Sequence, residues 1–161
     1  VCSVGSLHQE ISVGSVVLIN DFFDIHGGAS LSRYTDHRSH IAPAVNTNLY
    51  NQLHSIISSF LTNPKHAELA RFDNGETRLY QPKSTPNAPC VYVMSKGPRF
   101  ETPAEIRFYA TTGDVIGMTF GSELTLLCET PALPVAALCM VDNYANGVSK
   151  EELSLSLFKK G

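Results

Sequence analysis

Hydrophobic residues in this 161-residue chain occur in two patterns that alternate along the sequence. Short, predominantly apolar runs rich in β-branched residues, typical of buried strands, occur at 16–23, 90–95, 114–118 and 135–141. Apolar residues spaced three or four positions apart, typical of helices with one buried face, occur at 47–61, 103–111, 122–129 and 149–160. This alternation predicts an α/β fold with a mixed, mostly parallel central sheet flanked by helices.

Capping and turn residues mark the ends of several predicted elements. Thr102-Pro103-Ala104-Glu105 combines an N-cap, a proline at the first helical position and a capping-box glutamate, and Ser149-x-x-Glu152 repeats the box. Residues 24–43 are predicted to form a loop. Residues 64–89 contain Asn-Gly and several prolines, which predicts an irregular or hairpin-like surface connection.

The composition fits a single domain over residues 1–161. With 43% hydrophobic residues, the chain is long enough for one core and too short for two. A formal charge of −3 provides no basic face for a nucleic-acid polymer. The longest purely apolar run, 135–141, is far shorter than the roughly 20 residues that span a bilayer, so no membrane partner is expected.

The cysteines Cys2, Cys90, Cys128 and Cys139 are widely spaced and form no CxxC pair. Most lie in apolar stretches, where a small buried thiol is the usual structure. The first residues also lack the basic flank and apolar core of a signal peptide. We therefore expect a reducing, cytoplasmic location.

Three segments follow predicted strands at their carboxyl ends, where ligands gather in open α/β sheets. They are 96–101, 118–122 and 142–147, and we expect them to face one pocket. In the first, Phe100 offers a flat face for stacking and Glu101 an acceptor for ring N–H groups, as a purine base requires. The structural alternative is that Phe100 belongs to the core and that Glu101 favours the dipole of the next helix.

Longer motifs carry a family resemblance. GPRFETPAEIR at 97–107, GDVIGMT at 113–119 and then Glu123 resemble the purine nucleoside phosphorylase and methylthioadenosine phosphorylase family. VGSLHQEISVGSVVLINDF at 4–22 resembles its Gly-Ser-Leu turn and following strand, and VDNYANG at 141–147 its base-recognition loop. By this resemblance, the chain is expected to lack the family's amino-terminal phosphate-loop region and the end of its last helix.

The resemblance implies an enzyme that splits the N-glycosidic bond of a purine nucleoside by phosphorolysis. Inorganic phosphate is the co-substrate, and no further cofactor is implied. The resemblance assigns Phe100 to base stacking, Glu101 to the pyrimidine-side N–H groups, and Asn143 to N7 and the six-substituent. Because an asparagine offers both a donor and an acceptor, Glu101 with Asn143 resembles the pattern for six-oxopurines.

The same resemblance assigns residues to the sugar and the phosphate. Met118 is expected to lie against the ribose, and Thr119 and the backbone near Ser3 are expected to contact phosphate. Relatives that hold a free 5′-hydroxyl often carry a histidine where this chain has Leu155. An apolar residue there favours a 5′-deoxy or 5′-methylthio group, because an unpaired buried hydroxyl is costly.

A histidine-rich loop contains His26, Asp36, His37 and His40, whose spacing matches no common zinc pattern, so no metal site is expected. By resemblance, His40 and its neighbours are expected to reach into the pocket of another subunit in a homo-oligomer, a trimer or hexamer. An exposed loop is the alternative.

Two other functions remain open at the level of the sequence. A noncatalytic purine- or nucleoside-binding protein, or an inactive fragment, would keep the base residues without the phosphate groups. A hydrolytic nucleosidase would need a carboxylate and a water molecule near the sugar, an arrangement for which the sequence offers no candidate.

Overall fold

The computed structural model describes residues 1–27, 42–66, 71–72, 75–76, 78–80, 90–130 and 133–150. Six strands form one sheet in the order β2-β8-β1-β7-β6-β3. They are β1 (Cys2–Ser6), β2 (Val16–Ile19), β3 (Asp21–Asp24), β6 (Val91–Met94), β7 (Val115–Gly117) and β8 (Ala137–Tyr144). Of the five pairings, β1–β8, β3–β6 and β6–β7 are parallel, which confirms the predicted mixed, mostly parallel sheet.

The sheet curls, because β2 and β3 lie at its opposite edges although only Asn20 separates them in the chain. At this point the N–H groups of Asn20 and Asp21 both donate to the carbonyl of Cys90, at 3.2 and 3.4 Å. The prediction of a single strand over 16–23 was therefore wrong. Asn20 and Asp21 interrupt the apolar run at this corner, but two polar residues carry no information about a change of pairing partner.

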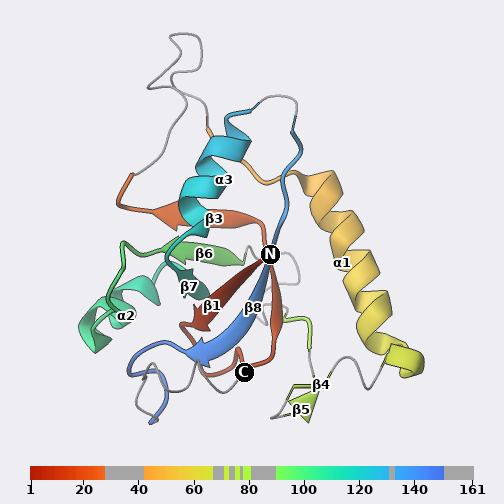
Figure 1. Cartoon of the computed structure of the whole chain (residues 1–161), viewed down its shortest axis with the longest axis horizontal. Helices are drawn as coiled ribbons and strands as arrows, with labels where there is room; N and C mark the ends of the chain where they lie inside the picture. Colours follow the sequence, from red (N-terminus) through yellow and green to blue (C-terminus); the bar gives the residue numbers. More distant parts are fainter. Residues whose placement is uncertain are drawn as a thin grey trace.

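Three helices surround the curled sheet (Figure 1): α1 (Thr47–Thr62), α2 (Pro103–Tyr109) and α3 (Phe120–Cys128). Each confirms a predicted helix, although α3 begins two residues before 122. A short 3-10 helix, η2 (Pro64–His66), and the antiparallel pair β4 (Arg71–Phe72) and β5 (Gly75–Glu76) lie in the predicted hairpin-like connection. Nearly all of the helix predicted over 149–160, with Glu152 of its capping box, lies outside the described residues.

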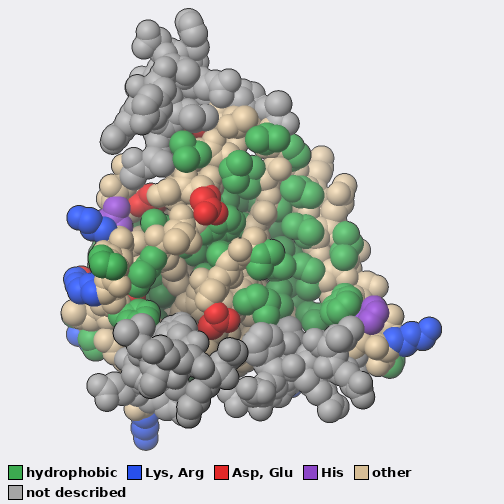
Figure 2. All heavy atoms as spheres, viewed as in Figure 1, with side chains coloured by type: hydrophobic (Ala, Val, Ile, Leu, Met, Phe, Trp, Pro, Cys, Tyr) green, Lys and Arg blue, Asp and Glu red, His purple; other side chains and the backbone are tan. Residues whose placement is uncertain are grey.

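Helix α1 begins at an asparagine cap, because Asn46 Oδ1 accepts a hydrogen bond from the N–H of Leu49 at 2.9 Å. Its sequence contains no Asp, Glu, Lys or Arg. None of its residues is fully buried, and Ile56 and Phe60 remain 63% and 40% exposed. Figure 2 shows hydrophobic side chains along this helix and across the middle of the same face.

Alternating side chains of the strands divide the core into two clusters. Tyr92 and Val115 point into the larger cluster, which also holds Leu124 of α3. Their neighbours Val93 and Ile116 point the other way, into a cluster formed with α2. This alternation is the two-residue period of strands whose two faces are both covered.

Two further observations concern expected binding partners. No helix in the described ranges is both long and apolar enough to cross a bilayer. Within the same ranges, His, Cys, Asp and Glu side chains form no group of three or more that is placed to hold a metal ion. Asp36, His37 and His40 lie outside the described residues.

Candidate functional site

The segment that follows β6 is held against the end of β7. Gly97 has a φ of +59° and lies so close to Met118 that a Cβ at this position would be 2.9 Å from the sulfur. A side chain would be unfavourable here both for its backbone conformation and for its contact. The glycine therefore lets the segment carrying Phe100 and Glu101 approach Met118.

The start of α2 is capped by residues other than Glu101. The Thr102 hydroxyl accepts from the N–H of Glu105, whose carboxylate accepts in turn from the N–H of Thr102 at 2.7 Å. Arg99 donates two hydrogen bonds of 2.8 Å to the same carboxylate. The hydrogen bonds from Arg99 have the largest effect on the pKa of Glu105, and the one from the Thr102 backbone N–H has the next largest. Together they lower this pKa to about 2. The predicted capping box is thus confirmed, and Glu105 performs the role that was the structural alternative for Glu101.

Glu101 is buried, with 8% of its surface exposed. Its backbone carbonyl accepts a hydrogen bond of 3.0 Å from the side-chain amide of Asn146. Its carboxylate, however, has no hydrogen-bond partner in the described part of the chain. The carboxylate, which can accept hydrogen bonds at two oxygens, is therefore available for donors from a ligand.

Asn143 lies near the end of β8, beside Gly5 of β1. A Cβ on Gly5 would be 3.1 Å from the amide nitrogen of Asn143, so the glycine provides room for this side chain. That nitrogen donates to the carbonyl of Tyr144 at 2.8 Å. The amide oxygen has no partner among the described residues and remains an acceptor for a ligand.

A β-bulge at Asp142 sets the direction of Asn143. The register passes from Val4 opposite Val141 to Gly5 opposite Asn143, which leaves Asp142 as an extra residue in β8. Bulges of this kind re-aim side chains and occur frequently beside active sites.

Asp142 also contacts a predicted phosphate residue. The exposed hydroxyl of Ser3 donates a hydrogen bond to the Asp142 carboxylate. A negative charge therefore lies beside the position where phosphate is expected. Asp142 has no predicted role from the sequence, although an acidic residue directly before Asn143 at the end of an apolar run was a usable signal.

Thr119 directly precedes α3 and is exposed. Unlike Thr102, it makes no side-chain capping bond. The N–H of Phe120, the first of the helix, already donates to the Tyr92 hydroxyl at 3.2 Å. The Thr119 hydroxyl and the next N–H groups of the first turn thus offer donors of the kind that bind anions at helix N-termini. This is compatible with the phosphate role expected from the resemblance.

The three predicted segments do not meet at one edge of the sheet. β1 is antiparallel to β7 and parallel to β8, so the carboxyl end of β8 lies opposite those of β6 and β7. That part of the expectation was wrong, because the strand pattern does not reveal direction. Segment 96–101 nevertheless contacts the other two segments. Gly97 lies beside Met118, and the backbone carbonyl of Glu101 accepts a hydrogen bond from the side-chain amide of Asn146.

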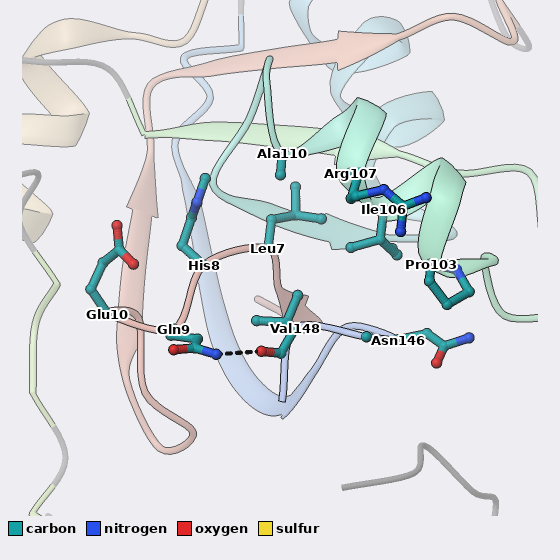
Figure 3. Close-up of a pocket in the computed structure, with 11 residues that line it drawn as sticks. Leu7, His8, Gln9, Glu10, Pro103, Ile106, Arg107, Ala110, Asn146 and Val148 are labelled. Carbon is teal, nitrogen blue, oxygen red and sulfur yellow. Dashed lines mark hydrogen bonds between the residues drawn. The ribbon is translucent and has the colours of Figure 1, made fainter. Parts of the chain in front are cut away.

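A hollow in the surface lies beside this region (Figure 3). Leu7, Ile106 and Val148 supply apolar lining, and the side-chain amide of Gln9 donates to the carbonyl of Val148 at 2.7 Å. The lining does not include the predicted site residues Ser3, Phe100, Glu101, Met118, Thr119 and Asn143. Two other predicted residues, His40 and Leu155, lie outside the described residues.

Comparison with known proteins gives consistent matches. The sequence pattern of the Phosphorylase superfamily matches residues 1–160. A probable 6-oxopurine nucleoside phosphorylase of Archaeoglobus fulgidus is 30% identical over 151 residues, covering 94% of this chain and 52% of that protein. A probable S-methyl-5′-thioinosine phosphorylase of Methanocaldococcus jannaschii is 32% identical over 154 residues, covering 95% of this chain and 52% of that protein.

Solved structures show the same fold. A methylthioadenosine phosphorylase from Schistosoma mansoni in complex with adenine matches with a TM-score of 0.64 and 20% identity, covering 99% of this chain and 57% of that one. A methylthioadenosine phosphorylase from an antarctic soil metagenomic library matches with a TM-score of 0.63 and 20% identity, covering 96% of this chain and 49% of that one. The chain thus spans about half the length of the curated relatives it matches.

Proposed function

The chain belongs to the phosphorylase superfamily, and we propose that it serves the phosphorolysis of a 6-oxopurine nucleoside, with or without a 5′-methylthio group. The reaction is a pentosyl transfer to inorganic phosphate. It releases the free purine and ribose 1-phosphate or its 5-methylthio analogue. The names of the relatives from Archaeoglobus fulgidus and Methanocaldococcus jannaschii support this substrate class.

The observation that carries the proposal is Glu101 itself, a residue with 8% of its surface exposed whose carboxylate accepts no hydrogen bond from the described residues. Glu105 already caps α2 and pairs with Arg99, so helix capping does not account for Glu101. A 6-oxopurine presents a ring N–H on its pyrimidine side. That group would supply the missing donor, in a charge-assisted bond worth about 1.5–3 kcal/mol.

Asn143 completes recognition of the base in this proposal. Its amide presents a donor and an acceptor, and protonated N7 beside a six-oxo group requires one of each. Phe100 would stack on the rings. The contact between Asn146 and the Glu101 backbone supports the proposal, because it ties the turn after β8 to the segment that carries Phe100 and Glu101.

The reaction itself needs no enzyme nucleophile. As the bond from the anomeric carbon to the purine breaks, its electrons move onto the base, and a phosphate oxygen forms the new bond to that carbon. The protein's contribution is to position the reactants and to stabilise the charge on the departing base. Glu101 and Asn143 act at the base, Met118 lies against the ribose, and Thr119 with the Ser3 backbone holds phosphate.

Further features of the proposed enzyme rest on the family resemblance. Inorganic phosphate is the co-substrate, with no other cofactor and no metal. Leu155 faces the 5′-substituent of the sugar. The enzyme is a cytoplasmic homo-oligomer, a trimer or hexamer, in which His40 approaches the pocket of a neighbouring subunit.

The direct test is release of hypoxanthine from inosine by the complete protein, with and without phosphate. Phosphorolysis requires that release depend on phosphate and that ribose 1-phosphate form in equal amount. Release that is independent of phosphate would identify a hydrolase instead. Tight binding of inosine without release would identify the noncatalytic binding protein.

A further inference from the structure

Two thiols lie side by side where β1 pairs with β8. Cys2 and Cys139 are opposite each other in this parallel pair, and their sulfur atoms are 3.0 Å apart. Both are free thiols in the structure. We propose that Cys2 and Cys139 form a reversible disulfide, which makes this strand pair a site of thiol oxidation.

The strand register suits such a bond. Neighbouring strands are about 4.7–4.9 Å apart, which lies inside the range of roughly 4.4–6.8 Å that disulfides require between Cα atoms. Both side chains face the larger core cluster, so no strand needs to rotate to bring the sulfurs together. Forming the bond requires the sulfurs to approach by about 1 Å, to roughly 2.05 Å.

The two thiols differ in access and acidity. Cys2 is partly exposed, whereas Cys139 is 0% exposed. The hydrogen bond with the Cys139 thiol lowers the pKa of Cys2, and the same contact together with burial raises the pKa of Cys139. Since the thiolate is the reactive form, Cys2 is the residue that reacts with an oxidant from solvent, and Cys139 resolves the product.

The chemistry balances with a low-molecular-weight disulfide such as oxidised glutathione as the oxidant. The Cys2 thiolate attacks one sulfur of the oxidant, forming a mixed disulfide and releasing one glutathione thiolate. The Cys139 sulfur then attacks the Cys2 sulfur, and its proton passes to the departing thiolate, which leaves as the second glutathione. Two protein thiols are oxidised, and one small disulfide is reduced to two thiols.

The other two cysteines have different surroundings. The half-buried Cys128 donates to the carbonyl of Ala44 at 3.4 Å, and burial raises its pKa. Burial also raises the pKa of Cys90 to about 12. Neither has a second sulfur in contact, so Cys128 provides an internal comparison: it is partly accessible but has no resolving thiol.

The bond would form next to residues of the candidate site. Ser3 directly follows Cys2, and Asp142, its hydrogen-bond partner, is three residues beyond Cys139. A covalent link at this point would clamp the two strands that present Ser3 and Asn143. The inference rests on the geometry of the two thiols alone, so it stands or fails independently of the proposed phosphorolysis.

The test is incubation of the complete protein with oxidised glutathione, followed by alkylation and peptide mapping by mass spectrometry. Trypsin alone leaves Cys128 and Cys139 in one peptide, so cleavage after glutamate is added to separate them at Glu129. We expect a peptide containing Cys2 cross-linked to one containing Cys139, with the loss of two hydrogens. Dithiothreitol should reverse the cross-link.

Variants make the result specific. In Cys139→Ser, glutathione should remain attached to Cys2 as a mixed disulfide, while Cys128→Ser should cross-link like the wild type. Because Cys139 lies in the core, Cys2→Ser provides a second test, in which Cys139 should stay reduced. The proposal is overturned if wild-type Cys2 stays reduced or glutathionylated, or if either cysteine pairs with Cys90 or Cys128 instead.

Discussion

At the residue scale, Glu101 and Glu105 show how two nearby carboxylates take different roles. Glu105 is bound by Arg99 and by the Thr102 backbone, and its side chain is partly exposed. Glu101 is buried, and its carboxylate has no donor in the described part of the chain. The sequence identified both positions, Glu105 through the local capping box and Glu101 through its place beside Phe100 after a predicted strand. It gave no measure of burial, which distinguishes the two carboxylates here.

The role of Asn143 is tested by changing its amide to a carboxylate. Asn143→Asp should shift preference from six-oxo towards six-amino purines, because a carboxylate accepts from an amino group but cannot donate to a carbonyl oxygen. We expect a change of about 1–3 kcal/mol in relative transition-state binding. The measurement is kcat/KM for inosine and for adenosine. An unchanged ratio would contradict the assignment of Asn143 to the base.

The neighbouring Asp142 illustrates a limit of the sequence at this scale. Its hydrogen bond to Ser3 depends on the bulge in β8, which places one extra residue opposite the step from Val4 to Gly5. A bulge depends on pairing with a strand more than 130 residues away in the chain. The apolar pattern of β8 therefore gave no signal for it.

At the element scale, α2 and α3 differ in how much of their structure is local. The start of α2 is specified by Thr102, Pro103 and Glu105 within four residues, and it was predicted correctly. Helix α3 has no side-chain cap at Thr119 and depends on packing against β6. Its start was therefore placed two residues late.

The capping network of α2 predicts a dependence of stability on pH. The pKa of Glu105 falls from 4.5 to about 2 in the folded chain, so its contribution is complete above about pH 4.5 and is lost as the pH falls towards 2. Wild type should therefore have a higher melting temperature than Glu105→Gln at neutral pH. The difference between the two melting temperatures should become smaller as the pH falls from about 4.5 to about 2. Thermal melting from about pH 7 to about pH 2 measures it. Glu123→Gln, at an exposed first-turn glutamate of α3, should show no comparable change; a constant gap for Glu105→Gln would contradict the account.

The packing of α3 on β6 predicts an unusual effect of alanine. In an open helix, Gly→Ala stabilises by up to about 1 kcal/mol. At Gly121, however, a Cβ would lie 2.6 Å from the Cβ of Met94, so Gly121→Ala should destabilise by about 1–3 kcal/mol. Urea unfolding measures this. As a control, Ser55→Ala on the exposed side of α1 should change the free energy of unfolding by less than about 0.5 kcal/mol. A Gly121→Ala variant that is more stable than the wild type would contradict the prediction, because it would show that α3 is free to move away from β6.

At the scale of the whole molecule, the class of fold followed from the sequence and the topology did not. Alternating strands and helices predicted the α/β class because each pattern reports local burial. Pairing partners and directions depend on contacts between distant segments. The run at 16–23 consequently became two strands at opposite edges, and β8 runs opposite to β6 and β7. The site is connected by the hydrogen bond from the Asn146 side-chain amide to the Glu101 carbonyl, which no local pattern encodes.

The proposed recognition of a purine by Glu101 is the central claim, and steady-state phosphorolysis of inosine by Glu101→Ala, beside thermal melting, tests it most directly. Loss of the acceptor should lower kcat/KM by roughly 2–4 kcal/mol, about 30- to 1,000-fold, with little change in melting temperature. Glu105→Ala is the matched control and should show the opposite pattern, because it removes the cap of α2 but no base contact. Near-normal turnover of Glu101→Ala together with a lowered melting temperature would contradict the account and return Glu101 to a structural role.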